Sequence, residues 1–146
     1  DLVQKTLAPL DRTATEAGIE LHFATTADEI DILADRSQMS TLIAQLVRNS
    51  IESLRGADRN GNVSVTLRDD MPNTVELSVV DDGPGIESDN VRRHLFDPFY
   101  SGRSAGRGLG FGLCLAWRIV RNHAGLILHE TPDGGGAAFH VAIPRK

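Results

Sequence analysis

The sequence predicts an α/β (α+β) two-layer sandwich in which a mixed β-sheet carries its helices on one face. Segments with apolar residues at helical spacing separate pairs of short segments in which apolar and polar residues alternate with period two. Grouped strands divided by helices are typical of this fold class. The 146 residues can bury one hydrophobic core, so we expect one domain over residues 1–146.

Two helices are predicted from apolar spacing and from residues that start or stop helices. Residues 1–17 form the first, which Gly18 can end, and Pro9 is expected to kink this helix or delay its start. The second helix has Ser37 as its expected N-cap and Gly56 as its stop. Its apolar residues follow the i, i+3, i+4, i+7 rule and are Met39, Leu42, Ile43, Leu46, Val47, Ile51 and Leu54.

The remaining elements follow from shorter patterns. Residues 113–121 are apolar almost all round, which predicts a buried helix that Gly125 ends. Strands are predicted where alternation, or a short apolar run, lies between turn residues. These strands are residues 19–23, 30–34, 63–67, 75–79, 126–128 and 139–143.

Composition and charge limit the class of function. The formal net charge of −5 argues against a nucleic-acid surface, which is usually basic. The only lysines, Lys5 and Lys146, lie outside any P-loop pattern, and no apolar run approaches the roughly 20 residues that cross a membrane. The single Cys114 fits a reducing compartment. We therefore expect a cytoplasmic domain without direct membrane contact. Because the chain starts with Asp1, we expect a fragment whose parent could be membrane-anchored.

One carboxylate is expected to point into the core. Val75, Leu77 and Val79 share one face of their strand, and Asp81 has the same parity. A buried carboxylate is costly unless it meets a donor, and an amino group on a bound base could be that donor. Asp82 has the opposite parity and should face solvent. The alternative is that this stretch is only a turn.

The second helix also carries a polar edge. Gln45, Asn49 and Glu52 are spaced by four and three residues, so they line one side of the helix. The amide oxygen of Asn49, at the margin of the core, can help to coordinate a magnesium ion held mainly by phosphates and water. The alternative is a solvated polar edge.

Residues 82–110 are rich in Gly and Arg and too long for an ordinary connection, so we expect a lid with a short helical turn near residues 91–95. The glycines from Gly106 to Gly112 let backbone N–H groups approach a phosphate at the start of the next helix. Guanidinium groups pair with phosphate oxygens, and Arg103 is the strongest candidate in the lid. The alternative is a flexible loop with solvated arginines. The other lid arginines are Arg92, Arg93 and Arg107, and the aromatic residues expected to hold the lid to the body are Phe96, Phe99 and Tyr100.

Taken in order, these segments resemble the ATP-binding domain of sensor histidine kinases, in the GHKL superfamily shared with gyrase-type ATPases. The resemblance covers nearly the whole chain. Asn49 matches the magnesium-binding asparagine of the N box, and Asp81 matches the adenine-reading position. The five matching segments are residues 42–54 (N box), 81–86 (D-x-G-x-G-I box), 96–99 (F box), 106–113 (second glycine box) and 135–139 (last glycine box).

The resemblance implies a Bergerat-type fold with about three helices and a long ATP lid, and it implies ATP and Mg²⁺ as cofactors. Asn49 would be the metal ligand, and Asn49, Gln45 and Arg103 would act in catalysis. The residues that would contact the nucleotide are Asn49, Asp81, Gly83, Gly85, Ile86, Phe96, Arg103, Gly106, Gly108, Leu109, Gly110, Phe111, Gly112 and Leu113.

The function implied is that of a protein-histidine kinase of a two-component system. The domain would position the γ-phosphate of ATP for transfer to a histidine on a dimerisation domain absent from this chain, and it would not autophosphorylate without that domain. A response regulator and a homodimeric parent are the implied partners. The alternatives are a stand-alone GHKL ATPase or anti-sigma-type serine kinase, and a degenerate nucleotide-binding or scaffold domain.

The chain departs from the family pattern at three places. Gln45 stands where many members have asparagine and superfamily ATPases have a water-activating glutamate. Glutamine cannot act as that base, which favours transfer to a protein histidine. Glu52 and Ser53 lie where many kinases have a phosphate-contacting lysine, and Arg107 replaces a common threonine.

The histidines show no triad-like or metal-ligand pattern. Residues 129–132 superficially resemble the start of a phosphoacceptor box, but they are interpreted as a strand that runs into a turn. His22 and His140 are expected in strands and His94 on the lid. His123 follows a helix C-terminus, which favours a cation.

Overall fold

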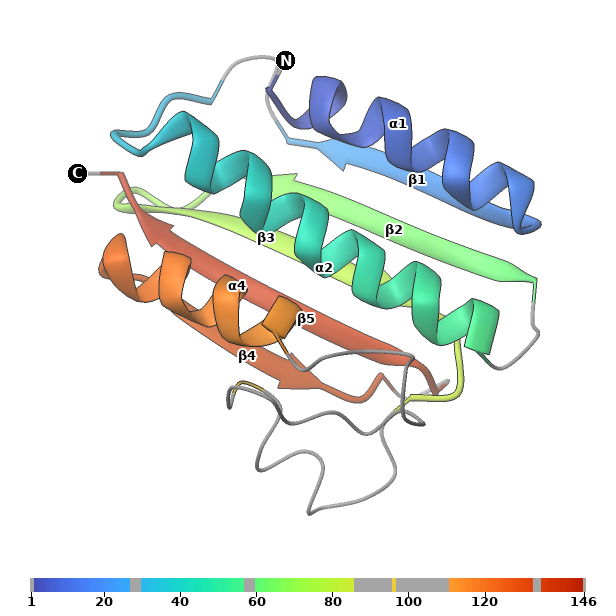
Figure 1. The fold of residues 1–146 in the computed structure, drawn as a ribbon. Helices are drawn as coiled ribbons and strands as arrows, with labels where there is room; N and C mark the ends of the chain where they lie inside the picture. The colour runs from blue at the N-terminus through green and yellow to red at the C-terminus, as the bar shows by residue number, and fades with distance from the viewer. Residues whose placement is uncertain are drawn as a thin grey trace.

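The computed structural model describes residues 2–26, 30–56, 60–85, 96, 111–132 and 135–145. Its elements in chain order are α1 (Leu2–Glu16), β1 (Ile19–Thr25), α2 (Arg36–Gly56), β2 (Gly61–Arg68), β3 (Thr74–Asp81), α4 (Phe111–Asn122), β4 (Leu126–Glu130) and β5 (Ala137–Pro144). The five strands form one sheet in the order β1-β2-β3-β5-β4, in which only the β1–β2 pair is parallel among the described strands. The helices α1, α2 and α4 cover one face of the sheet (Figure 1). The predicted two-layer sandwich is confirmed.

The first helix tolerates its proline. It begins at Leu2, so Pro9 does not delay its start, and the alternative of a kink at Pro9 stays a prediction. Proline removes one backbone donor from the helix interior. The buried side of the helix still packs on the core, which offsets that loss, and it consists of Val3, Leu7, Leu10 and Ala14.

The second helix begins one residue earlier than its predicted cap. It starts at Arg36, and the Gln38 N–H donates to Asp35 Oδ1 at 2.9 Å. Asp35 is therefore the N-cap, and the prediction of Ser37 is wrong because the carboxylate one turn back already satisfies a free N–H of the first turn. The helix ends at Gly56, as predicted.

The predicted strand at residues 30–34 does not form. Ile32 and Ala34 pack against the core, but Leu33 is exposed and its N–H donates to the Arg145 carbonyl at 3.0 Å. This short apolar run holds a loop beside the end of β5. Its residues are apolar because they pack on the core, and a buried strand would have the same composition.

The prediction that the third helix is buried all round is wrong. Ala116, Ile119 and Val120 face the core, whereas Leu115 and Trp117 are 39% and 43% exposed. The helix lies on one face of the sheet, so only one of its sides is covered (Figure 1). None of the described helices is long and apolar enough to span a bilayer.

His123, just after this helix, makes hydrogen bonds to two segments. The Asp35 N–H donates to its Nε2 at 3.1 Å. Its Nδ1 lies 2.8 Å from the Ile119 carbonyl oxygen. The ring therefore joins the end of α4 to the start of α2, and the sequence-based expectation of a cation here stays a prediction.

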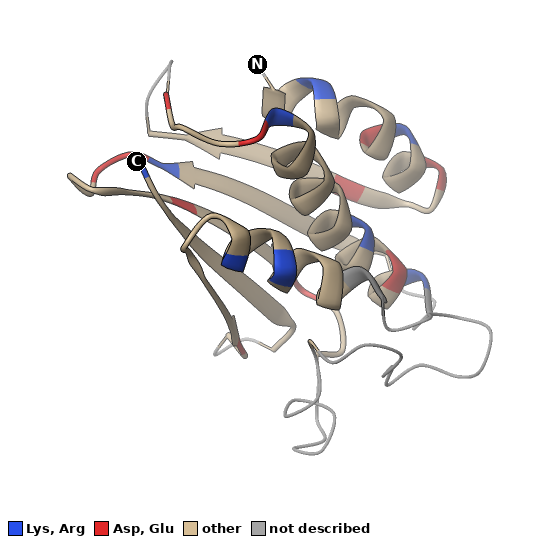
Figure 2. Cartoon of the chain, turned by 60° about the vertical axis from the view of Figure 1, so that its left-hand side comes forward, with Lys and Arg blue, Asp and Glu red and all other residues tan. Residues whose placement is uncertain are grey.

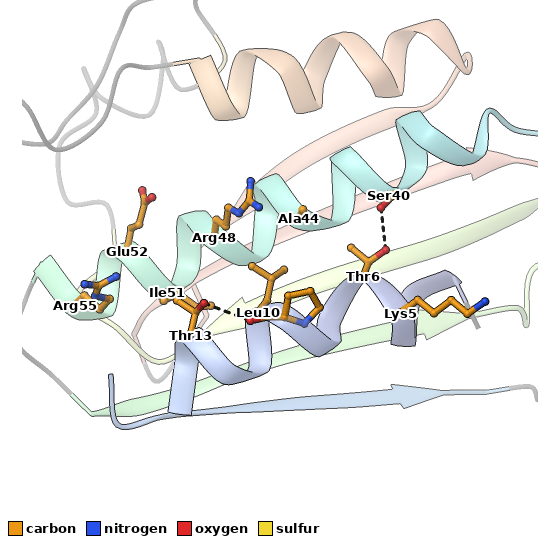
Figure 3. Close-up of a pocket in the computed structure, with 11 residues that line it drawn as sticks. Lys5, Thr6, Leu10, Thr13, Ser40, Ala44, Arg48, Ile51, Glu52 and Arg55 are labelled. Carbon is orange, nitrogen blue, oxygen red and sulfur yellow. Dashed lines mark hydrogen bonds between the residues drawn. The ribbon is translucent and has the colours of Figure 1, made fainter. Parts of the chain in front are cut away.

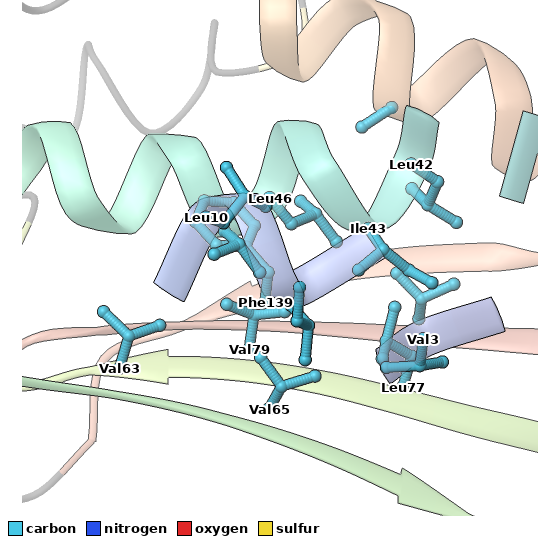
Figure 4. Packing of buried hydrophobic residues seen from close by; sticks show 14 of the residues in the cluster. Val3, Leu10, Leu42, Ile43, Leu46, Val63, Val65, Leu77, Val79 and Phe139 are labelled. Carbon is cyan, nitrogen blue, oxygen red and sulfur yellow. The ribbon is translucent and has the colours of Figure 1, made fainter. Parts of the chain in front are cut away.

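The core lies between the helices and the sheet (Figure 4). Leu42 and Leu46 of α2 and Val65, Val79 and Phe139 of the strands belong to this layer, and all five side chains are buried. Burying each such side chain contributes about 1.5–3 kcal/mol. This packing fixes α2 above β3 and thereby sets the position of the last residue of β3.

Candidate functional site

Asp81 ends β3 with its side chain in the core, as its parity predicts. The side chain is 2% exposed and follows the buried residues Val75, Leu77 and Val79 on the same face. Its Oδ1 accepts a hydrogen bond from the Gly83 N–H at 2.9 Å. This bond fixes the orientation of the carboxylate.

The second carboxylate oxygen has no partner in the described part of the chain. Asp81 Oδ2 is buried without a hydrogen bond, and so is Ser50 Oγ. Burial raises the pKa of the Asp81 carboxyl, the neighbouring Asp82 adds to this, and the Gly83 and Ala137 backbone and the Ser50 hydroxyl act against it. Ser50 is thus close enough to favour the ionised carboxylate, although its Oγ and Asp81 Oδ2 do not meet hydrogen-bond geometry. A buried acceptor that lacks a donor fits the amino group of a purine base.

The backbone around Asp81 is packed tightly. Gly85 has φ +75° and Gly136 has φ +91°, a region that favours glycine. A Cβ on Gly85 would lie 2.6 Å from the Gly136 carbonyl oxygen, and one on Gly136 would collide with the Asp81 carbonyl. A side chain at Gly83 would press on Asp81 Oδ1. The glycines of two predicted boxes therefore bring the loop after β3 against the turn before β5.

Asp82 points to the other side, as predicted. It is exposed, and its Oδ1 and Oδ2 accept hydrogen bonds from the Asn62 N–H at 2.8 Å and the Asn62 Nδ2 at 3.1 Å. This pair joins the end of β3 to the start of β2. Of the two adjacent aspartates, Asp81 therefore lies in the core, whereas Asp82 links two strands at the surface.

The predicted polar edge of α2 is also present. Gln45 and Asn49 are half-buried, and Glu52 is exposed. The intermediate burial of Asn49 places it at the margin of the core, one residue before the buried Ser50. Its amide oxygen is a hard ligand of the kind that Mg²⁺ takes. The described residues contain no cluster of three or more His, Cys, Asp or Glu that could hold a metal ion. A Mg²⁺ ion at Asn49 would thus depend on oxygens of phosphate and water.

Phe96 packs onto the body of the domain, as predicted. Its ring meets that of Phe139 edge-on, with 6.3 Å between the ring centroids and 75° between the planes. Leu113, near the start of α4, also packs against the core. Phe111 and Gly112 form the first turn of that helix, close to the predicted start. The free N–H groups of a helix start favour an anion.

Other predicted features lie outside the described residues. They are Ile86, Arg92, Arg93, His94, Phe99, Tyr100, Arg103, Gly106, Arg107, Gly108, Leu109, Gly110 and the helical turn at 91–95.

The histidines of the strands have structural partners. His22 and His140 lie in β1 and β5, and residue 129 lies in β4, as predicted. His140 contacts Ser78 Oγ through Nδ1 at 2.8 Å and Glu130 Oε2 through Nε2 at 2.9 Å. These contacts join β3, β5 and β4 across the sheet.

A cavity of about 520 Å³ between α1 and α2 is separate from this site (Figure 3). Thr6, Leu10, Arg48 and Ile51 are among its lining residues, and neither Asp81 nor Asn49 lines it. Figure 2 shows charges of both signs on α1 and α2 and basic residues on α4, so the described helices share no uniformly basic face.

Ser50 is the residue that sequence reasoning missed. It is fully buried, at 0% exposure, among the apolar residues of α2. A signal was available, because residues 46, 47, 50, 51 and 54 form one helical stripe in which position 50 alone is polar.

Comparisons with known proteins identify the family and the fold of the chain. The family described as histidine kinase-, DNA gyrase B- and HSP90-like ATPase matches residues 34–146. The C4-dicarboxylate transport sensor protein DctS of Rhodobacter capsulatus is 36% identical over 113 residues, covering 77% of this chain and 17% of that protein. The sensor protein FixL of Bradyrhizobium diazoefficiens is 31% identical over 133 residues, covering 90% of this chain and 25% of that protein.

A solved structure of the catalytic domain of histidine kinase ThkA superimposes with a TM-score of 0.86 at 28% identity, covering 99% of this chain and 90% of that chain. The present chain spans about a quarter or less of the two sensor proteins. The buried aspartate, the two glycine turns and the helix carrying Asn49 are thus found in a sheet and helix arrangement shared with a known kinase domain. The chain therefore belongs to the family of histidine kinase-, DNA gyrase B- and HSP90-like ATPases, and it is a catalytic, ATP-binding domain of the sensor histidine kinase type.

Proposed function

We propose that this domain binds ATP together with Mg²⁺ and positions the γ-phosphate for transfer to a histidine on a separate dimerisation domain. The observation that carries the proposal is the buried Asp81, whose Oδ1 is held by the Gly83 N–H while Oδ2 is left for a ligand. A fixed acceptor in a dry site favours a base that presents a donor at that point, such as the 6-amino group of adenine. The carbonyl that guanine has at the same ring position would place two acceptors together.

The other roles are assigned by chemistry and by the resemblance. Asn49 would offer its amide oxygen to Mg²⁺, which when bound neutralises charge on the phosphates. The backbone of residues 106–112 and the Arg103 guanidinium would hold the phosphate oxygens. The nucleotide contacts proposed beside these are Gly85, Ile86, Phe96 and Leu113. The lid at about residues 82–110 of a single domain belongs to the same proposal.

Gln45 supports transfer rather than hydrolysis. It lies one turn before Asn49 on the same helix, and an amide cannot take a proton from water at neutral pH. Water near the γ-phosphate would not be activated there, which leaves the phosphoryl group for a protein acceptor. The relatives include proteins named as sensor histidine kinases, so a stand-alone ATPase, an anti-sigma-type serine kinase or a scaffold is not favoured.

The setting of the domain follows from the same class of protein. A response regulator would receive the phosphoryl group from the parent's histidine, and the parent would be a homodimer with this domain in the cytoplasm. The domain would touch neither nucleic acid nor the membrane.

Calorimetric titration with ATP and GTP in the presence of Mg²⁺ tests the proposal. The wild-type chain is expected to prefer ATP, and Asp81→Ala is expected to lose that preference because the base-reading carboxylate is gone. Loss of one charge-assisted hydrogen bond corresponds to about a tenfold or larger fall in ATP affinity. Asp82→Asn is the matched control, since this neighbouring carboxylate points away from the core. An unchanged preference for ATP in Asp81→Ala would refute the assignment.

A further inference from the structure

The cavity between α1 and α2 is a groove that opens to solvent (Figure 3). Pro9 and Thr13 line it and are exposed. Its floor is apolar, because Leu10 and Ile51 are buried there, and the half-buried Ala44 has a side chain too short to fill the space between the helices. The volume of about 520 Å³ lies within the range of about 300–1,000 Å³ that is typical of binding pockets.

The hydroxyl groups that line the groove have partners on its own helices. Thr6 Oγ1 donates to the Leu2 carbonyl at 2.8 Å and is hydrogen-bonded to Ser40 Oγ at 3.0 Å, which ties α1 to α2 at one end of the groove (Figure 3). Thr13 Oγ1 donates to the Pro9 carbonyl at 3.3 Å. Because these hydroxyls are already bonded, apolar side chains gain more from entering the groove than a polar small molecule would.

The rim of the groove has a charge opposite to that of the chain. Its lining includes three basic residues and one acidic residue, a net charge of +2, whereas the formal net charge of the chain is −5. All four are exposed, and they are Lys5, Arg48, Glu52 and Arg55. A basic rim attracts an acidic partner. A second copy of this chain fits poorly, because a two-fold contact through this face would set one basic rim against another.

We propose that this groove is a docking site for an acidic amphipathic helix of a partner protein. Such a helix inserts apolar residues at i, i+3, i+4 and i+7 into a groove, and the residues that flank this stripe lie beside the rim. Acidic residues at the flanking positions would pair with the guanidinium groups of Arg48 and Arg55. The docking site is distinct from the proposed nucleotide site, since neither Asp81 nor Asn49 lines the groove.

The probe for this site is a synthetic helical peptide with leucine at the i, i+3, i+4 and i+7 positions, glutamate at the flanking positions and glutamine elsewhere. A second peptide, with lysine in place of each glutamate, is the charge control. Fluorescence anisotropy is expected to show that the wild-type chain binds the acidic peptide at least about tenfold more tightly than the lysine peptide. In NMR titrations, the amide shifts caused by the acidic peptide should lie in residues 5–13 and 40–55.

Two variants test the floor and the rim separately. Thr13→Phe fills part of the groove and is expected to weaken binding of the acidic peptide by about tenfold or more. Arg55→Glu reverses one rim charge and is expected to weaken it by about three- to tenfold. Thr15→Phe and Arg12→Glu are the matched controls, because both residues are exposed on α1 and do not line the groove. Both controls should bind the peptide like the wild type.

The thermal midpoint of each variant shows whether it is folded, and each should equal that of the wild type. No binding of the acidic peptide, or equal binding of both peptides, would overturn the proposal, as would amide shifts confined to α4 and the strands. Equal losses in Arg55→Glu and Arg12→Glu would mean that only the overall charge of the chain matters. Self-association of the chain that Thr13→Phe abolishes would assign the groove to a second copy instead. Failure to bind ATP would contradict the proposed function alone.

Discussion

Asp81 is the residue at which function and stability oppose each other. Burial raises the pKa of its carboxyl, and one of its oxygens lacks a donor in the described residues. A folded-state pKa above the unfolded value means that the folded chain holds a proton where the unfolded chain has released it. The stabilising contribution of Asp81 is therefore fully present below the unfolded pKa and is lost as the pH rises through the folded pKa.

Replacing the acid by its amide removes this pH dependence. Asp81→Asn is expected to raise the free energy of unfolding of the ligand-free chain near neutral pH by on the order of 1 kcal/mol, because no charge is then buried. The gain should shrink to zero toward acid pH, where the wild-type carboxyl is protonated. Urea denaturation of both chains across this range measures the difference, and a gain that grows on acidification would contradict the sign.

The positions of single residues could be predicted where a sequence pattern is compatible with only one structure. The parity of β3 placed Asp81 in the core and Asp82 outside, because alternation fixes both at once. Asp35 and Ser37 can both cap a helix, so the sequence could not decide between them without the geometry of the first turn. Ser50 was missed because the buried side of the second helix was predicted from its apolar residues alone, without the polar residue between them.

At the level of elements, the loop after β3 and the turn before β5 form one unit. Gly85 and Gly136 approach each other backbone to backbone, and Gly136 also contacts the Asp81 carbonyl. Asp81 and Ala137 are partners in the β3–β5 register, so the turn before β5 ends beside Asp81. The site therefore depends on how closely two chain segments far apart in sequence can approach.

Adding a methyl group at this contact should distinguish the cost of a steric collision from the cost of backbone strain. Gly136→Ala adds a collision with the Asp81 carbonyl to the strain of φ +91°. Gly135→Ala has nearly the same φ of +93° but open space around its Cβ. Strain alone costs about 1–2 kcal/mol, so Gly135→Ala should lose this amount and Gly136→Ala clearly more. Thermal or urea unfolding ranks the two; equal losses would mean that the contact does not matter.

Elements were predictable where their pattern is long or regular. The strands at 63–67 and 75–79 formed within longer strands because alternation over five residues specifies a half-buried strand. Residues 30–34 failed because a short apolar run also suits a loop that packs on the core. The last helix was predicted too deeply buried, since Leu115 and Trp117 are apolar residues that the one-sided layer leaves partly exposed.

Across the whole molecule, the central strands of the sheet have more hydrogen-bonded neighbours than the edge strands. β3 is bonded to β2 on one side and β5 on the other, whereas β1 lies at an edge and is bonded to β2 alone among the described strands. The helix α1 packs mainly against α2 and β1. The N-terminal segment of α1 and β1 is thus attached to the remainder along one strand and one helix.

Amide hydrogen exchange should follow this arrangement. We expect amides of α1 and β1 to exchange through smaller openings than those of β3 and β5, since local unfolding begins where fewest contacts must break. Native-state exchange followed by mass spectrometry measures both groups in one experiment. Equal protection of β1 and β3 would show that the domain opens only as a whole.

The fold class was predictable at this scale because pairs of strands divided by helices place the helices on one face. The strand order was not, because β5 lies between β3 and β4 and no local pattern specifies a pairing between residues about 60 positions apart. Such pairings are decided by the shape of the shared core. The candidate site also depends on this long-range pairing, because Asp81 lies opposite Ala137.

The central position of β3 also determines which part of the domain stays folded longest. Loss of the first 25 residues, by proteolysis or in mild denaturant, would remove the edge strand β1, which lies two strands away from β3. We expect β3, which ends in Asp81, to unfold later than this edge of the sheet. A nucleotide bound at Asp81, as proposed, would therefore be retained during partial unfolding at the edge.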